Sequence, residues 1–213
     1  MAAAETIRAE DAPRAPRGDA GGLPARLRHE TASLHAQVEA STGLPGSVRS
    51  RAEYVTLLQR LHGFHSAVEA RLAHPDWAEG WARLGIDLVG HGRSTLLAQD
   101  LGQLGSAVPA RPAVLGDIDS FPGALGCLYV TEGSSLGGRI IGPAIRATIG
   151  EVPTGFFESA GRQHPSPWRA LTQALRRFGD EGGDADAVIG GARSTFLAFE
   201  AQVASTQAPA VAR

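Results

Sequence analysis

Apolar residues recur along this chain mainly with the spacing of an α-helix. The clearest run lies between residues 51 and 74, where apolar side chains fall three or four positions apart. We expect that helix to bury Tyr54, Leu57, Leu58, Leu61, Phe64, His65, Val68 and Leu72. No segment alternates apolar and polar residues convincingly with the period that a half-buried strand requires. The pattern therefore predicts an all-α protein.

Capping and helix-breaking residues divide this pattern into roughly seven or eight helices. We expect them at residues 24–40, 51–74, 76–84, 92–104, 120–149, 167–179 and 185–204. Pro24 stands in the first turn of the first helix, and Ser166 and Asp184 are the predicted N-caps of the last two. The helix over 120–149 differs from the others because it is rich in glycine.

The composition is that of a single globular domain. The 213 residues are 43% apolar and 20% charged, which suits one substantial core. We expect residues 23–205 to form this domain. Residues 1–22 carry no packed apolar period and are expected to form a disordered arm, and residues 206–213 a flexible tail.

Charge and cysteine content exclude several classes of protein. A net charge of −2 gives no reason to expect a nucleic acid or an anionic membrane as partner. The most apolar long run, 121–149, contains Glu132, Arg139 and Arg146, so we expect a soluble protein without a membrane span. Cys127 is the lone cysteine, which excludes an internal disulfide or multi-cysteine metal site and suits the reducing cytoplasm.

The stretch Gly126–Gly142 reads as a helix with too many glycines. Gly133, Gly137 and Gly138 stand where a helix prefers side chains, and each costs about 0.5–1 kcal/mol relative to alanine. The spacing of the small residues is typical of close helix–helix packing. A second interpretation is that a planar ligand lies flat against the bare backbone, or that the helix bends there as a ligand enters.

The helix over 24–40 carries a pair of side chains that suits metal binding. His35 and Glu39 are four residues apart and share one face. Glu39 can accept a hydrogen bond from one imidazole nitrogen, directly or through water, which leaves the other nitrogen free as a more basic ligand. Arg28 and Thr31 fall on the same face, where a cation could hold an anionic group of the ligand. The alternative interpretation is a surface ion pair.

Together, the two segments resemble the heme oxygenase family, particularly its bacterial branch associated with phytochromes. The proximal-helix pattern of the family is matched by Leu27, Arg28, Thr31, His35 and Glu39. The distal-helix pattern is matched by Tyr129, Val130, Glu132, Gly133, Ser134, Leu136, Gly137 and Gly138. The resemblance extends essentially over Leu23–Ala204 and implies a multi-helical fold that holds heme between these two helices.

The resemblance implies a role for the central positions. His35 would be the axial ligand of the heme iron, and Glu39 would be its hydrogen-bonding partner. Gly133, Gly137 and Gly138 would let the distal helix lie against the macrocycle, and the small distal side would direct dioxygen toward a meso carbon.

Further positions would contact the edge of the heme. Arg28 would lie near a propionate, with Thr31 on the same face. Tyr129 and Arg139 could approach the propionates or the distal network, and Phe196 resembles a family aromatic packed at the heme edge. For the last three, core packing and a solvated charge remain open as alternatives.

One position departs from the better-known members of the family. Many of them carry a distal aspartate that orders water for oxygen activation, whereas this chain has Ser134 at the aligned position, as the phytochrome-associated branch does. The sequence therefore does not identify the group that delivers protons. Ser134, Ser135, a backbone carbonyl freed by the glycines, or another residue could hold the water.

The implied reaction makes heme both cofactor and substrate: dioxygen and electrons convert it to biliverdin, carbon monoxide and ferrous iron. The chain has no flavin- or nicotinamide-binding motif, so a ferredoxin or a flavin reductase is the expected electron donor. A bacteriophytochrome is a candidate recipient of the biliverdin.

Several alternatives remain open at this stage. The chain could bind or transfer heme without cleaving it, since the distal aspartate is missing. It could be a thiaminase-like helical hydrolase with Cys127 as nucleophile, or an interaction module whose glycines only pack against a partner. His62, His65 and Glu69 could share a metal-binding face, although a mixed core and surface interpretation is favoured.

Overall fold

The computed structural model describes residues 21–88, 92–108, 112–116, 118–135, 137–159 and 167–204. Every regular element in these ranges is a helix, which confirms the predicted all-α fold. The predicted arm up to residue 20, the predicted tail, and Leu136 and Ser166 lie outside the described residues.

The structure contains nine α-helices and one short 3-10 helix within its described ranges. Their bounds are α1 Leu23–Thr42, α2 Arg51–Leu72, η1 Pro75–Trp77, α3 Ala78–Leu84, α4 Ser94–Gln103, α5 Phe121–Ser135, α6 Gly138–Ile149, α7 Gly155–Ser159, α8 Pro167–Asp180 and α9 Ala185–Val203. The predicted cap of the last helix is confirmed, because the Asp184 side chain accepts a hydrogen bond from the Ala187 amide at 2.9 Å. The predicted buried stripe of α2 is also confirmed.

Two predictions about helix number were wrong. The glycine-rich segment is not one helix to Ile149, because α5 ends at Ser135 and α6 begins at Gly138. Consecutive glycines allow the backbone to change direction there. The other difference is α7, which the sequence pattern did not predict. Its five residues, GFFES, are too few to display a helical period.

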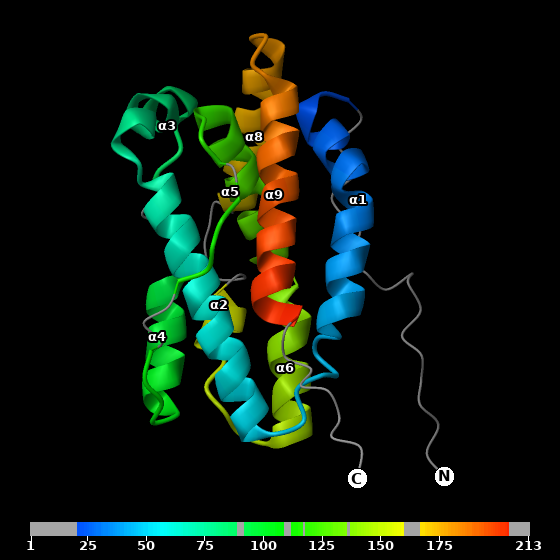
Figure 1. The fold of residues 1–213 in the computed structure, drawn as a ribbon, viewed down its shortest axis with the longest axis vertical. Coiled ribbons are helices and arrows are strands. Elements are labelled where there is room, and N and C mark those ends of the chain that lie inside the picture. The colour runs from blue at the N-terminus through cyan, green and yellow to red at the C-terminus, as the bar shows by residue number, and fades with distance from the viewer. Residues whose placement is uncertain are drawn as a thin grey trace.

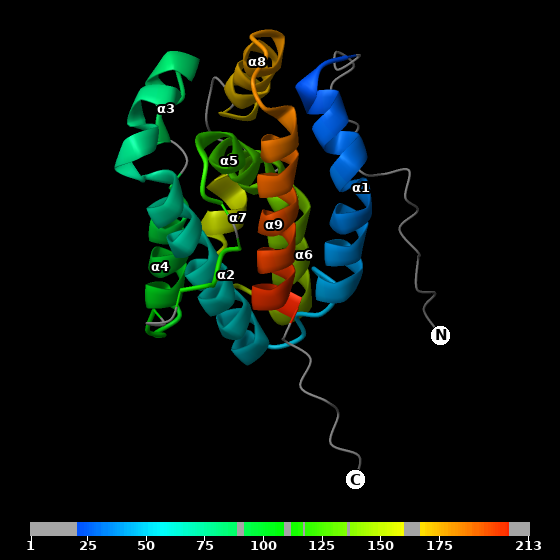
Figure 2. The same cartoon turned by 45° about the horizontal axis from the view of Figure 1, so that its top comes forward.

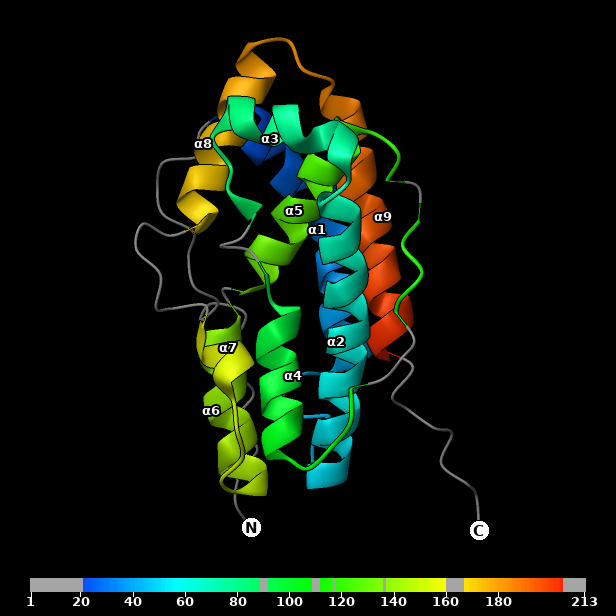
Figure 3. The ribbon, with the colours of Figure 1, turned by 90° about the vertical axis from the view of Figure 1, so that its left-hand side faces the viewer.

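Helix α9 occupies the centre of the fold. It lies between α1 and α2, with α5 packed behind it (Figure 1). The tilted view shows the same order, with α7 beyond α2 and α9 (Figure 2). Seen from the side, α4, α6 and α7 lie together at the end of the molecule away from α3 and α8 (Figure 3). No described helix is long and apolar enough to cross a membrane.

The contact between α5 and α9 is a backbone-to-backbone contact. A Cβ atom on Gly126 would overlap the Val188 carbonyl, and one on Gly191 would overlap the Gly123 carbonyl. Two glycines on facing helices therefore let the helix axes approach closely. The neighbouring side chains Leu125 and Ala192 are fully buried in the same interface.

This contact predicts opposite effects for two adjacent glycines of α9. Gly191→Ala should lower the free energy of unfolding by about 1–3 kcal/mol, because the new methyl group must push α5 away. Gly190→Ala is the matched control: nothing lies within 4 Å of its Cβ position, so the change should raise stability by about 0.5–1 kcal/mol. Urea denaturation of both variants measures the difference, and equal effects would contradict the close contact.

Candidate functional site

A cavity of about 450 Å³ opens between α1, α2, α5, α6, α7 and α9. Its volume lies in the range typical of cofactor and substrate sites. Most of its surface is apolar and comes from aromatic and aliphatic side chains such as Val38, Leu61, Phe156 and Phe199. A few polar groups converge on this apolar surface, and the predicted His35–Glu39 pair is among them.

His35 and Glu39 share one face of α1, as predicted, and their side chains are in contact. His35 Nδ1 lies 3.6 Å from Glu39 Oε1, one helical turn further along. The side chains are 58% and 70% exposed, so the imidazole is accessible from the solvent side of the cavity. Phe196 of α9 meets the His35 ring edge-on, with 6.0 Å between ring centroids. Phe196 is itself buried in the core, so it restrains the ring from behind.

Four predicted contact residues do not line the cavity. Thr31 is buried and donates its hydroxyl hydrogen to the Leu27 carbonyl at 2.8 Å, within α1. Arg28 and Arg139 are exposed on α1 and α6. Tyr129 packs against Trp168, with 5.3 Å between ring centroids. The structure brings none of these side chains into the cavity wall, so their contact with heme stays a prediction.

Gly133, Gly137 and Gly138 all line the cavity, but the space that a side chain would find differs from one to the next. A Cβ atom on Gly138 would stand 2.5 Å from the Phe157 carbonyl oxygen, so α7 itself requires a glycine there. A Cβ on Gly133 would approach Trp168 no closer than 3.4 Å, and one on Gly137 would lie 3.5 Å from the Ser134 carbonyl. Packing in the described chain therefore explains Gly138, and it does not by itself require glycine at positions 133 and 137.

Ser134 and Ser135 also line the cavity. Each hydroxyl donates to a carbonyl one turn back in α5, Ser134 to Thr131 at 2.8 Å and Ser135 to Glu132 at 2.7 Å. With the hydrogen engaged, each oxygen can still accept a hydrogen bond. Both serines can therefore hold a water molecule as acceptors.

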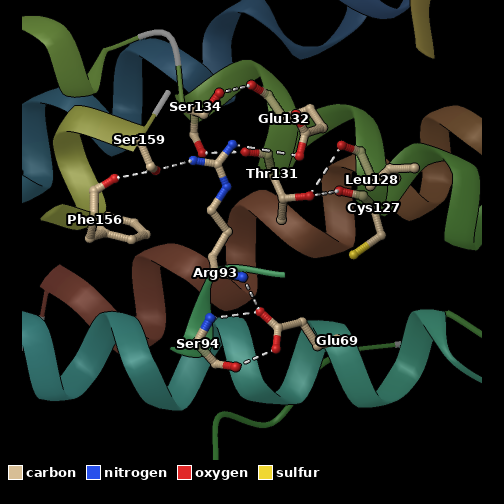
Figure 4. Close-up of polar contacts among 11 residues, drawn as sticks. Glu69, Arg93, Ser94, Cys127, Leu128, Thr131, Glu132, Ser134, Phe156 and Ser159 are labelled. Carbon is tan, nitrogen blue, oxygen red and sulfur yellow. Dashed lines mark hydrogen bonds and ion pairs between the residues drawn. The ribbon is translucent and has the colours of Figure 1, made fainter. Parts of the chain in front are cut away.

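Arg93, which the sequence analysis did not select, extends from the start of α4 into the cavity wall (Figure 4). Its guanidinium group lies 3.7 Å from the carboxylate of Glu132 and donates to the Ser159 hydroxyl at 3.3 Å. The side chains of Arg93 and Glu132 are nearly enclosed, with exposed fractions of 11% and 3%. The opposite charges compensate each other where water is scarce.

Glu69 holds the base of Arg93 in place (Figure 4). Its carboxylate accepts hydrogen bonds from the Arg93 amide at 2.5 Å and the Ser94 amide at 2.8 Å, and from the Ser94 hydroxyl. These amides belong to the first turn of α4, where no intrahelical acceptor exists. A carboxylate of α2 thus caps α4, which excludes Glu69 from the metal face considered with His62 and His65. Among the described residues, no group of three metal-binding side chains occurs.

His65 lines the cavity from α2 and is 4% exposed. Its ring meets Phe64 and Phe156 edge-on, at 5.4 and 5.3 Å. Burial, together with the charges of Arg93 and His62, lowers its pKa to about 3. The ring is therefore neutral at pH 7, with one nitrogen as donor and the other as acceptor.

Cys127 is buried and does not line the cavity. Burial raises the pKa of its thiol to about 11, so the reactive thiolate is scarce at neutral pH. This argues against the hydrolase alternative with Cys127 as nucleophile.

Of the three polar residues that the structure adds to the site, Arg93, Glu132 and His65, only Glu132 could have been suspected from the sequence. Glu132 belongs to the distal pattern, and a carboxylate inside an apolar run is a sign of a buried partner. Arg93 stands in a polar stretch, and His65 has the spacing of an ordinary core residue.

Comparison with known proteins relates the chain to one family. No protein-family model matches it. It is 33% identical to a heme oxygenase of Xanthomonas campestris pv. campestris (strain 8004) over 164 residues, which span 73% of this chain and 92% of the relative.

Two solved structures share the fold. The NO- and CO-bound heme oxygenase of Neisseria meningitidis has a TM-score of 0.63 and 22% identity, covering 89% of this chain and 95% of its own. Heme oxygenase 2 of Chlamydomonas reinhardtii, solved without heme, has a TM-score of 0.67 and 17% identity, covering 90% and 100%.

The neutral state of His65 predicts an acid-sensitive fold. Its folded pKa lies below the unfolded value of 6.5, so the unfolded chain takes up the proton first. Stability from this group is complete above that value and falls by about 1.4 kcal/mol for each pH unit toward the folded pKa. His65→Gln should flatten the decline of unfolding free energy between pH 6.5 and 4.5, compared with the exposed control His29→Gln. Parallel pH profiles would contradict the burial of a neutral ring.

Proposed function

This chain belongs to the heme oxygenase family, and we propose that it cleaves heme with dioxygen and electrons to biliverdin, carbon monoxide and ferrous iron. The observation that carries the proposal is the position of His35. Its ring lines a cavity of about 450 Å³, contacts Glu39 and Phe196, and shares that cavity with glycines of α5 and α6.

The residues present fit a heme. A largely apolar wall suits a porphyrin, and the imidazole of His35 suits its iron. Gly133 and Gly137 provide bare backbone that the described chain does not itself fill. When bound, heme supplies both the iron that activates dioxygen and the porphyrin that is oxidised.

In this proposal, Glu39 holds His35 ready for the iron. With its Nδ1 hydrogen directed at Glu39, the ring would present Nε2 as the ligand atom, and the carboxylate would make that nitrogen more basic. Phe196 limits the orientations of the ring. Arg28 and Arg139 remain candidates for the propionates on the exposed side of the site.

Water in the cavity would be held by several groups in place of the missing aspartate. Arg93 offers donors, and the neutral His65 offers one donor and one acceptor. The oxygen of Ser134 can accept in addition. These groups can position water for proton delivery without a carboxylate at position 134.

The remaining proposals concern the setting of the reaction. We place the enzyme in the cytoplasm, in the phytochrome-associated branch, with a ferredoxin or a flavin reductase as electron donor and a bacteriophytochrome as recipient of biliverdin. Residues 23–205 would form the heme oxygenase domain. The serine at position 134 favours one competing function, a heme-binding or heme-transfer protein without turnover.

Hemin followed by ascorbate or a reductase system distinguishes these two functions. The wild-type protein should develop a Soret band with hemin, and the band should then decay as biliverdin absorption grows. A stable Soret band under reducing conditions would indicate the transfer protein, and no Soret band would contradict both.

His35→Ala should change the spectrum of the bound heme and abolish turnover, because the iron loses its ligand. Glu39→Gln should lower turnover about 10- to 100-fold, the usual effect of removing a ligand's hydrogen-bonding partner. His29→Ala, on an exposed position of the same helix, is the control and should behave as wild type. An unchanged spectrum in His35→Ala would contradict the axial assignment.

Two neighbouring glycines separate ligand binding from folding. Gly137→Ala should leave the apo-protein as stable or raise its unfolding free energy by about 0.4–1 kcal/mol, but weaken hemin binding. Gly138→Ala should destabilise the apo-protein by about 1–3 kcal/mol, because its methyl group meets the Phe157 backbone. Hemin titration and urea denaturation of both variants provide the check. Unweakened hemin binding by Gly137→Ala would place the heme elsewhere.

A further inference from the structure

The short helix α7 forms part of the cavity wall through Phe156 and Phe157. A helix of five residues has too few internal hydrogen bonds to be stable by itself. Its position must therefore be determined by its neighbours, and the side view shows it next to α4 and α6 (Figure 3).

We propose that Asp100 of α4 is a positioning residue of this site, which fixes Phe156 in the cavity wall by holding the start of α7. Asp100 Oδ1 accepts a hydrogen bond from the Gly155 amide at 3.1 Å, and Oδ2 accepts one from the Phe156 amide at 2.9 Å. Both amides lie in the first turn of α7, where the helix provides no acceptor. Asp100 is 2% exposed, so water cannot take over this role.

The sequence of α7 accommodates this carboxylate. A Cβ atom on Gly155 would stand 2.9 Å from Asp100 Oδ1, closer than side chains ordinarily pack. The position can therefore carry a side chain only if the carboxylate moves. Glycine at this point is thus matched to Asp100, although its backbone is that of an ordinary helix.

The other end and the other face of α7 are held as well. Arg93 donates to Ser159 at the end of α7. Arg93 and Asp100 are seven residues apart, which is two helical turns, so both side chains can reach α7 from the same face of α4. On the opposite side, Gly138 and Gly142 of α6 leave room for Phe157. Among these contacts, the one made by Asp100 is to the backbone amide of Phe156, a residue that lines the cavity.

The consequence for the site passes through one aromatic contact. The Phe156 ring lies 5.3 Å from the His65 ring, and both line the cavity. Loss of the bond to the Phe156 amide frees this ring and alters the wall next to His65. The inference rests on the proposed function for its ligand, heme, but the effect on α7 does not depend on heme.

The test combines Asp100→Asn with Phe156→Leu, singly and together. Asp100→Asn keeps the size of the side chain but directs an NH₂ group at one of the two amides. Hydrogen–deuterium exchange of α7 should accelerate about tenfold or more, as expected for loss of a charge-assisted hydrogen bond. Asp180→Asn, an exposed carboxylate at the end of α8, is the matched control and should leave exchange in α7 unchanged.

Hemin affinity provides the readout that separates positioning from general support of the fold. Asp100→Asn should weaken hemin binding about tenfold in the wild-type background, equal to about 1.4 kcal/mol. In the Phe156→Leu background it should weaken binding less than twofold, because the ring through which it acts is gone. Equal weakening in both backgrounds, or unchanged exchange in α7, would overturn the proposal.

Wild-type protein that binds no hemin would contradict the proposed function, not the role of Asp100. In that case, the same four proteins are titrated with the apolar dye ANS, which probes the cavity without heme. The non-additive pattern should persist with the dye, and an additive pattern would overturn the proposal in the same way.

Discussion

The structure depends on the close approach of α5 and α9. Glycines at 126 and 191 bring the two backbones into contact, and α9 packs on its other side against α1. Because α9 contacts both helices, the distance from His35 on α1 to the glycines of α5 is set through it. Phe196 of α9 touches the His35 ring directly, so the same helix that sets the spacing also limits the orientation of that ring.

Around the cavity, charged side chains of one helix bind the free backbone amides or the opposite charge of another helix. Glu69 of α2 accepts from the first amides of α4, and Asp100 of α4 accepts from the first amides of α7. Arg93 connects α4 to Glu132 of α5 and to α7. Each of these contacts fixes the end of an element that contributes to the wall. An enclosed charge is costly without a partner, so the arrangement favours one relative position of the helices.

The glycines of the distal segment differ in how tightly the rest of the chain packs against them. Gly138 is required by the chain, since α7 packs directly against its backbone, and Gly142 is tight against Phe157 for the same reason. Gly133 and Gly137 face the cavity with no comparable constraint from the described residues. Close packing, one of the two interpretations of the sequence, therefore applies at Gly138 and Gly142, whereas ligand binding is our proposal for Gly133 and Gly137.

Sequence alone determined the helical class, most helix boundaries and the central pair of the site. These features are local: the period of α2, the Asp184 cap and the four-residue spacing of His35 and Glu39 all arise within one helix. The break between α5 and α6, the existence of α7, and the arrival of Arg93, His65 and Asp100 around the cavity were decided by tertiary structure. Their partners lie far away along the chain, as Asp100 and Gly155 show, and no local pattern encodes such a pairing. Arg28 and Thr31 share a helix face with His35, yet neither lines the cavity, because a face shared within a helix does not determine what each part of that face meets.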